Sequence, residues 1–237
     1  MKFENQVILI TGATGNLGRA LVDALADSGS NLALFDHREG RLREMYSDLE
    51  GKIRLLYVEN IDLSEQEAAR RGIDQVIDRF GRIDIVINAA GGYAGGDPVD
   101  QTSVELWDRM MGLNARSVFL VSRMVIPLMR SQRSGSIVNV AARPGVKGQK
   151  NAAAYSVSKS AVLRLTESIS AEVKQDGIRV NAVIPGTMDT PENRRAMPGA
   201  NHAHWVEPAA VADAILFLAS EQARGICGAS IPVLGAS

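Results

Sequence analysis

Seven short apolar runs alternate with longer amphipathic segments from one end of the chain to the other. The runs occupy residues 6–10, 31–35, 53–58, 83–88, 136–141, 178–184 and 229–233. Because they are apolar on both faces, they are typical of strands in a parallel sheet that is covered on both sides. Helical patterns lie between them, at residues 17–28, 39–49, 64–80, 103–131, 152–175 and 208–220. The alternation predicts repeated βαβ units and therefore an α/β fold with a doubly wound sheet.

The sequence predicts one domain over residues 1–237, because no linker rich in Pro or Ser interrupts the series. One segment, 187–207, lacks a clear period and carries two prolines and a glycine after a predicted strand. A long loop in a compact domain is often functional, so we expect a substrate lid there. The alternative is a loosely ordered surface excursion.

Composition excludes several classes of partner. The formal net charge is −1 with no basic block, so we expect neither nucleic acid nor an anionic membrane as a partner. No apolar run approaches ~20 residues, the length that spans a bilayer. Cys227 is the single cysteine, which excludes an internal disulfide and favours the cytoplasm. The three histidines lack metal-ligand spacing, so no metal is predicted.

A glycine-rich stretch, TGATGNLG at residues 11–18, follows the first predicted strand and precedes a predicted helix. Gly12, Gly15 and Gly18 let the backbone turn sharply and approach a pyrophosphate, which the free N–H groups of the helix N-terminus attract. This context makes the triplet a dinucleotide-binding signal. We include Thr14, Asn16 and Leu17 of the same loop among the predicted cofactor contacts.

Asp36 follows the second predicted strand, eighteen residues beyond Gly18. A carboxylate at this place accepts hydrogen bonds from both ribose hydroxyls and repels a 2′-phosphate. Arg38 could compensate that repulsion, so we expect NAD (NADH) as the preferred cofactor, with NADP possible. Alternatively, Asp36 is only a strand-end turn residue.

Other predicted strand ends carry polar residues or glycine at the same edge of the sheet, where open α/β sheets bind ligands. These predicted cofactor contacts are Asp62 and Leu63, the stretch Asn88, Ala89, Ala90 and Gly91, and the pair Pro185 and Gly186. Taken singly, each could be ordinary loop punctuation. Together they favour a dinucleotide site.

Tyr155 and Lys159 are four residues apart on a predicted helix and can therefore share one face. A nearby ammonium would lower the pKa of the phenol towards working pH and make Tyr155 a proton donor to a substrate. A tyrosine and a lysine at this spacing also occur by coincidence. The position of the pair, on the helix after the fifth predicted strand of a nucleotide-binding fold, favours catalysis.

These motifs, with Asn114, YSVSK (155–159) and PGTMDT (185–190), resemble the short-chain dehydrogenase/reductase family over essentially the whole chain. The resemblance implies a single Rossmann-type domain with a seven-stranded parallel sheet flanked by helices. It implies a catalytic group of Tyr155, Lys159 and Asn114, with Lys159 also binding the nicotinamide ribose. Asn114 would hold a helix bulge and a water, while Thr187 and Thr190 would meet the nicotinamide carboxamide.

Two residues depart from the family pattern. Asn16 stands where most single-domain members have glycine or alanine. Ala142, thirteen residues before Tyr155, stands where the family has a serine that donates a hydrogen bond to the substrate carbonyl. An alanine cannot make that bond.

A closer similarity is to the dihydropteridine reductases, a divergent branch that also lacks the serine. It rests on AGGYAGG (90–96), AARPG (141–145), TMDTPENRRAMP (187–198) and Trp205. This similarity implies reduction of a quinonoid dihydropterin by NADH, a reaction for which one proton donor suffices. Tyr93 would flank the flat substrate, where a tryptophan would be the closer match; alternatively it only packs under a loop.

Three functions remain open. The first is an NAD(P)H-dependent reductase of a small planar conjugated compound, such as a quinonoid dihydropteridine. The second is a general carbonyl reductase or alcohol dehydrogenase, for example a 3-oxoacyl thioester reductase, in which another polar group replaces the serine. The third is a dinucleotide-binding protein without catalysis. Family members commonly pair the helices predicted at 103–131 and 152–175, so we also expect a homodimer or homotetramer.

Overall fold

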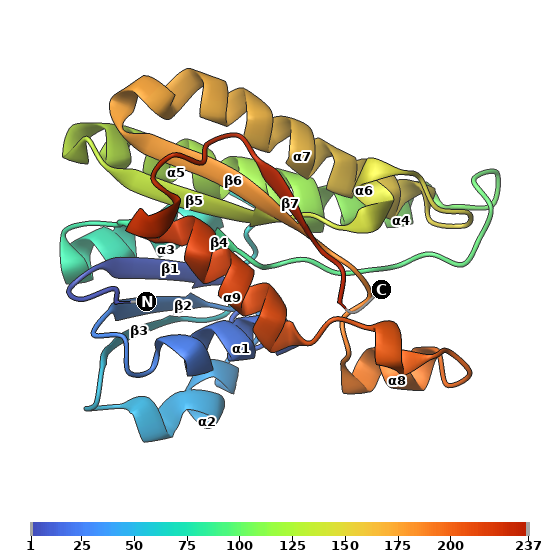
Figure 1. The fold of residues 1–237 in the computed structure, drawn as a ribbon, viewed down its shortest axis with the longest axis horizontal. Coiled ribbons are helices and arrows are strands. Elements are labelled where there is room, and N and C mark those ends of the chain that lie inside the picture. The colour runs from blue at the N-terminus through green and yellow to red at the C-terminus, as the bar shows by residue number, and fades with distance from the viewer. Residues whose placement is uncertain (1, 236–237) are drawn as a thin grey trace.

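The computed structural model describes residues 2–235 and shows one α/β domain, a seven-stranded sheet with helices on both faces (Figure 1). The strand order is β3-β2-β1-β4-β5-β6-β7, and every pair is parallel. This doubly wound arrangement confirms the predicted fold class. The strands are β1 (Val7–Thr11), β2 (Asn31–Phe35), β3 (Arg54–Val58), β4 (Ile85–Asn88), β5 (Gly135–Val140), β6 (Ile178–Pro185) and β7 (Ser230–Val233).

The strands coincide with the seven predicted apolar runs to within two residues at each end. The inner strands β1 and β4 are buried at every position, as two-sided covering requires. The edge strand β3 is half-buried, and its first residue, Arg54, is exposed. Apolar character on both faces therefore located the sheet correctly.

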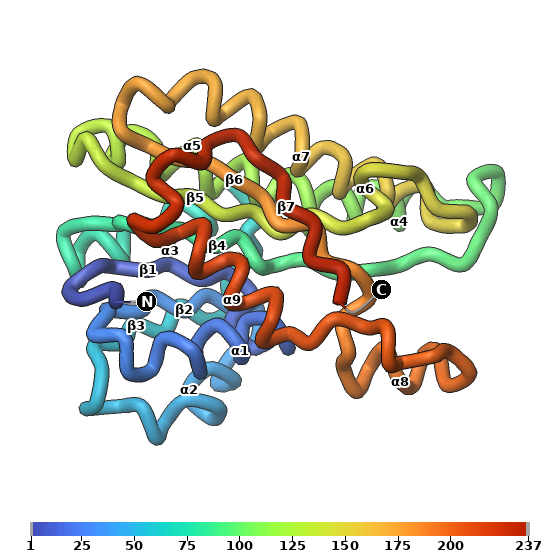
Figure 2. The backbone as a smooth tube through the Cα atoms, in the orientation of Figure 1, coloured from blue at the N-terminus to red at the C-terminus, as the bar shows by residue number. Residues whose placement is uncertain are grey.

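The helices form two layers (Figures 1 and 2). Helices α1 and α9 pack against each other on one face of the sheet, and α3, α5 and α7 cover the other. Their bounds are α1 (Asn16–Leu25), α2 (Arg41–Tyr46), α3 (Gln66–Phe80), α4 (Val104–Met110), α5 (Ser117–Gln132), α6 (Arg143–Val146), α7 (Ala153–Val173), α8 (Pro191–Ala196) and α9 (Pro208–Ala219).

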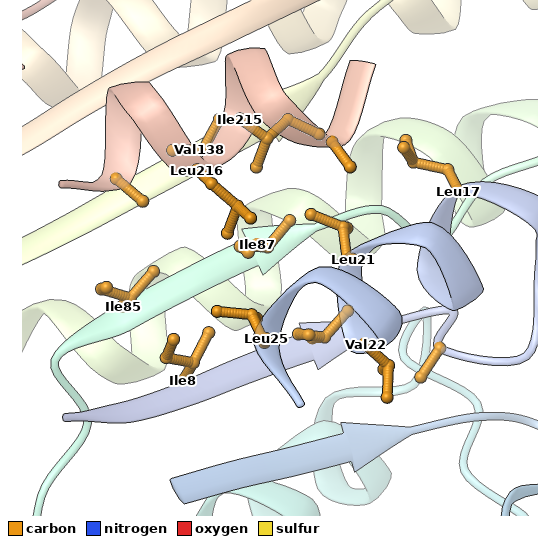
Figure 3. Close-up of a cluster of buried hydrophobic side chains, with 14 of the residues drawn as sticks. Ile8, Leu17, Leu21, Val22, Leu25, Ile85, Ile87, Val138, Ile215 and Leu216 are labelled. Carbon is orange, nitrogen blue, oxygen red and sulfur yellow. The ribbon is translucent and has the colours of Figure 1, made fainter. Parts of the chain in front are cut away.

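Branched apolar side chains fill the space between each helical layer and the sheet. Figure 3 shows the first layer, where Leu21 and Leu25 of α1 meet Ile87 of β4 and Ile215 of α9. These four side chains are completely buried. Each contributes roughly 1.5–3 kcal/mol through burial, so the layers hold the strand ends in a fixed relation.

The predicted single helix at 103–131 is wrong in one respect. Residues Met111–Arg116 form a π-helix between α4 and α5, a local widening of the helix by about one residue. A helical sequence period cannot reveal one extra residue, because the apolar face continues on both sides. The widening carries Asn114, which is completely buried.

The segment 187–207 contains regular structure that its sequence does not reveal. Helix α8 and a short 3₁₀ turn at His202–His204 lie within it. An isolated parallel bridge joins Met188 to Val206, so the two ends of the segment lie side by side. The segment is therefore a folded excursion with a narrow base.

Candidate active site

The glycine-rich loop lies at the carboxyl end of β1 and brings the backbone of the first helix to the sheet edge. Gly12 has φ +68°, a conformation that favours glycine, and a Cβ there would lie 2.8 Å from the Cα of Ala90. A Cβ on Gly18 would lie 2.6 Å from the Cα of Ala13. Only glycine fits these two positions, as expected for a loop that approaches a ligand with its backbone.

The N-terminus of α1 points its free N–H groups out of this loop. Gly15 is the N-cap residue and provides no side chain to satisfy them. Asn16 and Leu17 are the first residues of the helix, so the predicted loop residues form an anion-attracting end. A pyrophosphate fits this set of donors.

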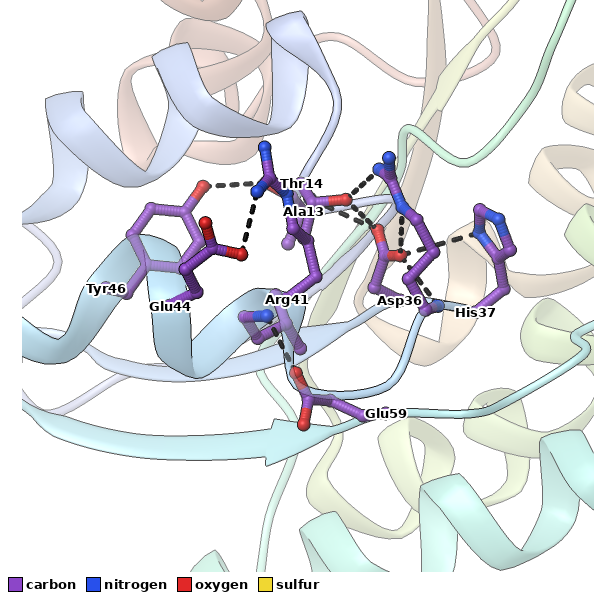
Figure 4. Close-up of polar contacts among 10 residues, drawn as sticks. Ala13, Thr14, Asp36, His37, Arg41, Glu44, Tyr46 and Glu59 are labelled. Carbon is purple, nitrogen blue, oxygen red and sulfur yellow. Dashed lines mark hydrogen bonds and ion pairs between the residues drawn. The ribbon is translucent and has the colours of Figure 1, made fainter.

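Asp36 lies one residue beyond β2, beside the glycine-rich loop (Figure 4). Its carboxylate accepts hydrogen bonds from the Thr14 hydroxyl at 2.5 Å and from the backbone and Nε of Arg38 at 3.0 and 3.2 Å. His37 Nδ1 lies 3.4 Å from the same carboxylate. Burial alone would raise the pKa of Asp36, but the bonds from Thr14 and Arg38 outweigh it and lower the pKa. The carboxylate therefore stays ionised and is paired with Arg38.

A small hollow opens beside Asp36 and is lined by residues from the loops after β1, β2, β3 and β4, from the π-helix and from α5. The sequence prediction included Gly12, Asp36, Asp62, Leu63 and Ala90 of its lining but missed Phe35, His37, Ile61, Ser64, Leu113 and Ser117. Leu113 and Ser117 flank Asn114, so proximity to a predicted site residue was the available signal. The apolar and acidic lining fits the adenosine part of a dinucleotide.

Some predicted cofactor contacts have their side chains committed elsewhere. Asn88 donates to Asn139 at 2.9 Å, and Asn139 donates to Thr166 of α7 at 2.9 Å, all within the buried interior. Asp62 accepts from Ser64 in a turn. Thr190 caps α8 by accepting from the N–H of Asn193. These side chains hold the backbone that surrounds the site.

Pro185 and Gly186 lead from β6 into the segment 187–207. The N–H of Gly186 donates to Val233, and a Cβ on Gly186 would lie 3.1 Å from the carbonyl oxygen of Leu234. The carbonyl of Thr187 accepts from Val206 at 3.0 Å. The backbone here is fixed on both sides, and the side chain of Thr187 makes no hydrogen bond within the described residues.

Asn114 clamps two parts of the site together. Its side-chain oxygen accepts from the N–H of Gly92, and its amide donates to the carbonyl of Gly92 and to the Ser158 hydroxyl, at 3.0, 3.0 and 3.1 Å. The predicted helix bulge is the π-helix that carries this residue. Sequence reasoning missed Ser158, although it stands inside YSVSK. The clamp joins the loop after β4 to α7.

Lys159 lies buried behind this clamp. Nζ donates to the carbonyl oxygen of Val140 at 2.8 Å, and a Cβ on Gly91 would lie 3.2 Å from Nζ. Burial lowers the pKa of Lys159 to about 8. The lysine therefore loses its proton at a lower pH than an exposed lysine does.

The ring of Tyr155 contacts the ring of Tyr93. The ring centroids are 5.0 Å apart and the planes meet at 79°, an edge-to-face contact. Burial, and secondarily the proximity of Tyr93, raise the pKa of Tyr155 to about 12. The predicted lowering of this pKa by Lys159 is wrong for this structure, because the ammonium bonds Val140 and burial dominates the phenol.

Two loops meet beside these rings. The N–H of Gly96 donates to the carbonyl of Asn151 at 2.7 Å, and Figure 2 shows the loop after β4 and the loop before α7 side by side. Ala142 is 8% exposed at the end of β5 and offers no hydrogen-bonding side chain. The alanine that replaces the family serine therefore leaves the site without a hydroxyl donor at this position.

A contact missed by sequence reasoning joins the segment 187–207 to the glycine-rich loop. Asn16 donates from its side-chain amide to Glu192 of α8 at 2.8 Å. The hydrogen bond from the Asn16 amide stabilises the charged form of the Glu192 carboxyl and lowers its pKa. The segment therefore touches the N-terminus of α1.

Two negative findings apply to residues 2–235. No group of three or more His, Cys, Asp or Glu side chains there could hold a metal ion. In the same range, no helix has the length and apolar character needed to cross a membrane.

Comparisons with known proteins agree with this arrangement. The profile of a family described as short chain dehydrogenase matches residues 6–200. The chain is 31% identical to the 3-oxoacyl-[acyl-carrier-protein] reductase of Thermotoga maritima, covering 99% of this chain and 98% of that protein. It is 33% identical to the meso-2,3-butanediol dehydrogenase of Serratia marcescens, covering 99% and 95%. The structure of NAD⁺-bound xylitol dehydrogenase aligns with TM-score 0.91 and 28% identity, covering 100% of both chains.

None of these three proteins is named as a dihydropteridine reductase. The closer similarity to that branch stays a prediction. The names of the three relatives instead match the second function left open by the sequence, that of a carbonyl reductase or alcohol dehydrogenase.

Proposed function

Because the chain belongs to the short-chain dehydrogenase family, it is an NAD(P)-dependent oxidoreductase, and we propose that it interconverts a carbonyl and an alcohol on a small planar substrate. The observation that carries the proposal is the Tyr155 phenol, which stands beside the exposed ring of Tyr93 and makes no hydrogen bond within the described residues. A protonated, unengaged hydroxyl at this edge suits proton transfer to a substrate oxygen. Since the chain is an oxidoreductase, the third function, binding without catalysis, is set aside.

The nicotinamide cofactor, when bound, supplies or accepts the hydride. The residues that would hold it are the backbone of the glycine-rich loop, Asp36, and the backbone of Ala90, Gly91 and Gly186. We propose NADH as the preferred form, because Asp36 is ionised and Arg38 is already paired with it. A free arginine would serve a 2′-phosphate better.

Tyr155 acts as the proton donor in the reductive direction. Its raised pKa keeps the phenol protonated throughout the physiological range. Lys159, with a pKa of about 8, can return a proton towards the phenol from inside the protein. Asn114 keeps the two elements in register, since it binds both the Gly92 backbone and Ser158.

Tyr93 selects the shape of the substrate. Its ring is 60% exposed and lies edge-to-face with Tyr155, so a flat group can pack on it at the reacting hydroxyl. Glycines on both sides of Tyr93 leave room for such a group. We therefore place planar or cyclic ketones ahead of long flexible ones.

Ala142 favours a second candidate reaction, the reduction of a quinonoid dihydropterin. The electrophile in that compound is a conjugated imine, for which a single proton donor suffices. Tyr93 would pack on the pterin ring in the same way. The dihydropteridine reductase function is therefore retained as the alternative.

NADH oxidation measured against a panel of cyclic ketones, 3-oxoacyl thioesters and quinonoid dihydropterin tests both candidates. We expect turnover of a carbonyl and its loss in Tyr155→Phe, with NADH affinity retained. Turnover of the pterin alone would replace the first candidate with the second. Unchanged activity in Tyr155→Phe would remove both.

We further propose a homodimer or homotetramer in the cytoplasm. Trp107, Phe119 and Val157 are 40%, 45% and 43% exposed on α4, α5 and α7, and Phe217 of α9 and Ile231 of β7 are exposed as well. Large exposed apolar side chains suit contact with further copies of the chain. Light scattering that shows a monomer at micromolar concentration would contradict this.

A further inference from the structure

The site lacks a second hydroxyl at Ala142, although a substrate carbonyl is best held by more than one donor. Nearby serines are engaged with the protein. Ser158 donates to the carbonyl of Tyr155 at 2.8 Å and accepts from Asn114. Ser156 is buried, and its oxygen accepts from the N–H of Gln149 at 3.2 Å. A residue on another element can supply a replacement donor.

The four tyrosines of the chain fall into two classes. Tyr46 donates to the carbonyl of Ala13 at 2.7 Å, and Tyr57 donates to the carbonyl of Tyr46 at 3.0 Å. The hydroxyls of Tyr93 and Tyr155, in contrast, make no hydrogen bond within residues 2–235. Hydroxyl groups left without a protein partner are available to a ligand.

The loop holds Tyr93 in place beside Tyr155. The residue before it, Gly92, is bound at both its N–H and its carbonyl by Asn114. A Cβ on Gly95 would lie 2.7 Å from the carbonyl oxygen of Asn151 and 3.0 Å from the Tyr93 hydroxyl, so the phenol packs closely against this part of the loop. The two phenols also interact electrostatically, since Tyr93 contributes to the raised pKa of Tyr155.

We infer that Tyr93 is a second catalytic residue, whose hydroxyl holds the substrate oxygen in the role left open by Ala142; the inference rests on the proposed function. During reduction the carbonyl carbon receives the hydride and the oxygen receives the Tyr155 proton. Tyr93 keeps its own proton and donates only a hydrogen bond to the same oxygen. The donor thus comes from the loop after β4 instead of the end of β5.

Steady-state kinetics on four proteins test the inference: wild type, Tyr93→Phe, Ala142→Ser and the double variant. Tyr93→Phe keeps the ring contact and removes only the hydroxyl, so we expect kcat/KM for a ketone to fall roughly 10- to 100-fold. Ala142→Ser should raise kcat/KM by a larger factor in the Tyr93→Phe background than in wild type, a non-additive result. Tyr57→Phe, which removes a phenolic hydroxyl outside the site, is the matched control.

The inference is overturned if Tyr93→Phe retains the wild-type kcat/KM, or if Ala142→Ser has the same effect in both backgrounds. NADH affinity, measured by fluorescence for each variant, separates a catalytic loss from a folding or cofactor defect. Tyr155→Phe separates the two proposals. If Tyr155→Phe is inactive and Tyr93→Phe is not, only the inference fails; if Tyr155→Phe stays active, the proposed function fails first.

Discussion

Lys159 donates a hydrogen bond of 2.8 Å from Nζ to the carbonyl oxygen of Val140, the last residue of β5. The side chain is only 5% exposed. Helix α6 packs against the backbone of α7 at this residue, because a Cβ on Gly145 would lie 2.7 Å from the Lys159 carbonyl carbon. This enclosure, and not a neighbouring charge, determines the pKa of the lysine.

The enclosure of Lys159 predicts an alkaline gain in stability. The folded pKa of about 8 lies below the ordinary 10.5, so the unfolded chain binds more protons between these values. The free energy of unfolding should therefore rise with pH across that window, by at most about 3 kcal/mol. Urea unfolding of wild type and Lys159→Met at several pH values measures it, and the rise should be absent in the variant.

The buried phenol of Tyr155 should make the free energy of unfolding fall with rising pH, at higher pH than the rise caused by Lys159. Its folded pKa of about 12 exceeds the ordinary 10.0, so the free energy of unfolding should fall as pH rises from 10 to 12.

In the Lys159→Met measurement, Lys150→Met removes an exposed ammonium and is the control for loss of one positive charge. Equal pH profiles for wild type and Lys159→Met would show that the lysine is not enclosed in solution.

Asp36 predicts a shift in cofactor use. Asp36→Ser removes the carboxylate and releases Arg38, so NADH affinity should fall by roughly tenfold or more while NADPH affinity rises. Titration of both coenzymes by fluorescence gives the ratio. Arg38→Ala is the counterpart and should weaken NADPH alone; an unchanged ratio in both variants would contradict the assigned role of the pair.

Asn114 predicts a loss of both stability and catalysis. Asn114→Ala strands the N–H and carbonyl of Gly92 and one partner of Ser158, each worth about 1–3 kcal/mol when buried. The melting temperature of Asn114→Ala should therefore be many degrees lower than that of wild type, and its kcat should be reduced. Ser158→Ala breaks a single bond of the clamp and should have a smaller effect; equal losses would mean that the clamp does not act through Gly92.

The bond between Glu192 and Asn16 should restrain the motion of the segment 187–207. Its bond to Asn16 connects α8 to the glycine-rich loop, and both partners are exposed, so overall stability depends little on it. Glu192→Ala should speed amide exchange of α8 without lowering the melting temperature. Glu207→Ala, at the other end of the same segment, is the control, and unchanged exchange at α8 would rule out a fastening role.

The sheet could be predicted because buried parallel strands need apolar side chains on both faces, and Ile8 to Ile10 or Ile85 to Ile87 leave little choice. The pairing of Tyr155 with Lys159 on one helix followed from spacing alone. The pKa of each did not, since it depends on how α6 and the loop after β4 enclose them. The residues next to Tyr155 and Lys159 in the sequence do not predict how far these two side chains are buried.

Contacts between distant segments were equally beyond the sequence. Asn16 and Glu192 are 176 residues apart, and nothing in either neighbourhood marks the other. Tyr93 was predicted as a substrate residue, yet its contact with Tyr155 depends on the loop geometry that Asn114 maintains. The commitment of Asn88 to Asn139 likewise needed the register of β4 and β5, which only the assembled sheet provides.

The π-helix at Met111–Arg116 restricts how this chain can vary in length. Loss of one residue there would let α4 and α5 merge into a regular helix and would turn Asn114 by about 100° around its axis, away from Gly92. An insertion would turn it the other way. Evolution can exchange side chains along this stretch, but the number of residues in it is fixed by the direction in which a single amide must point.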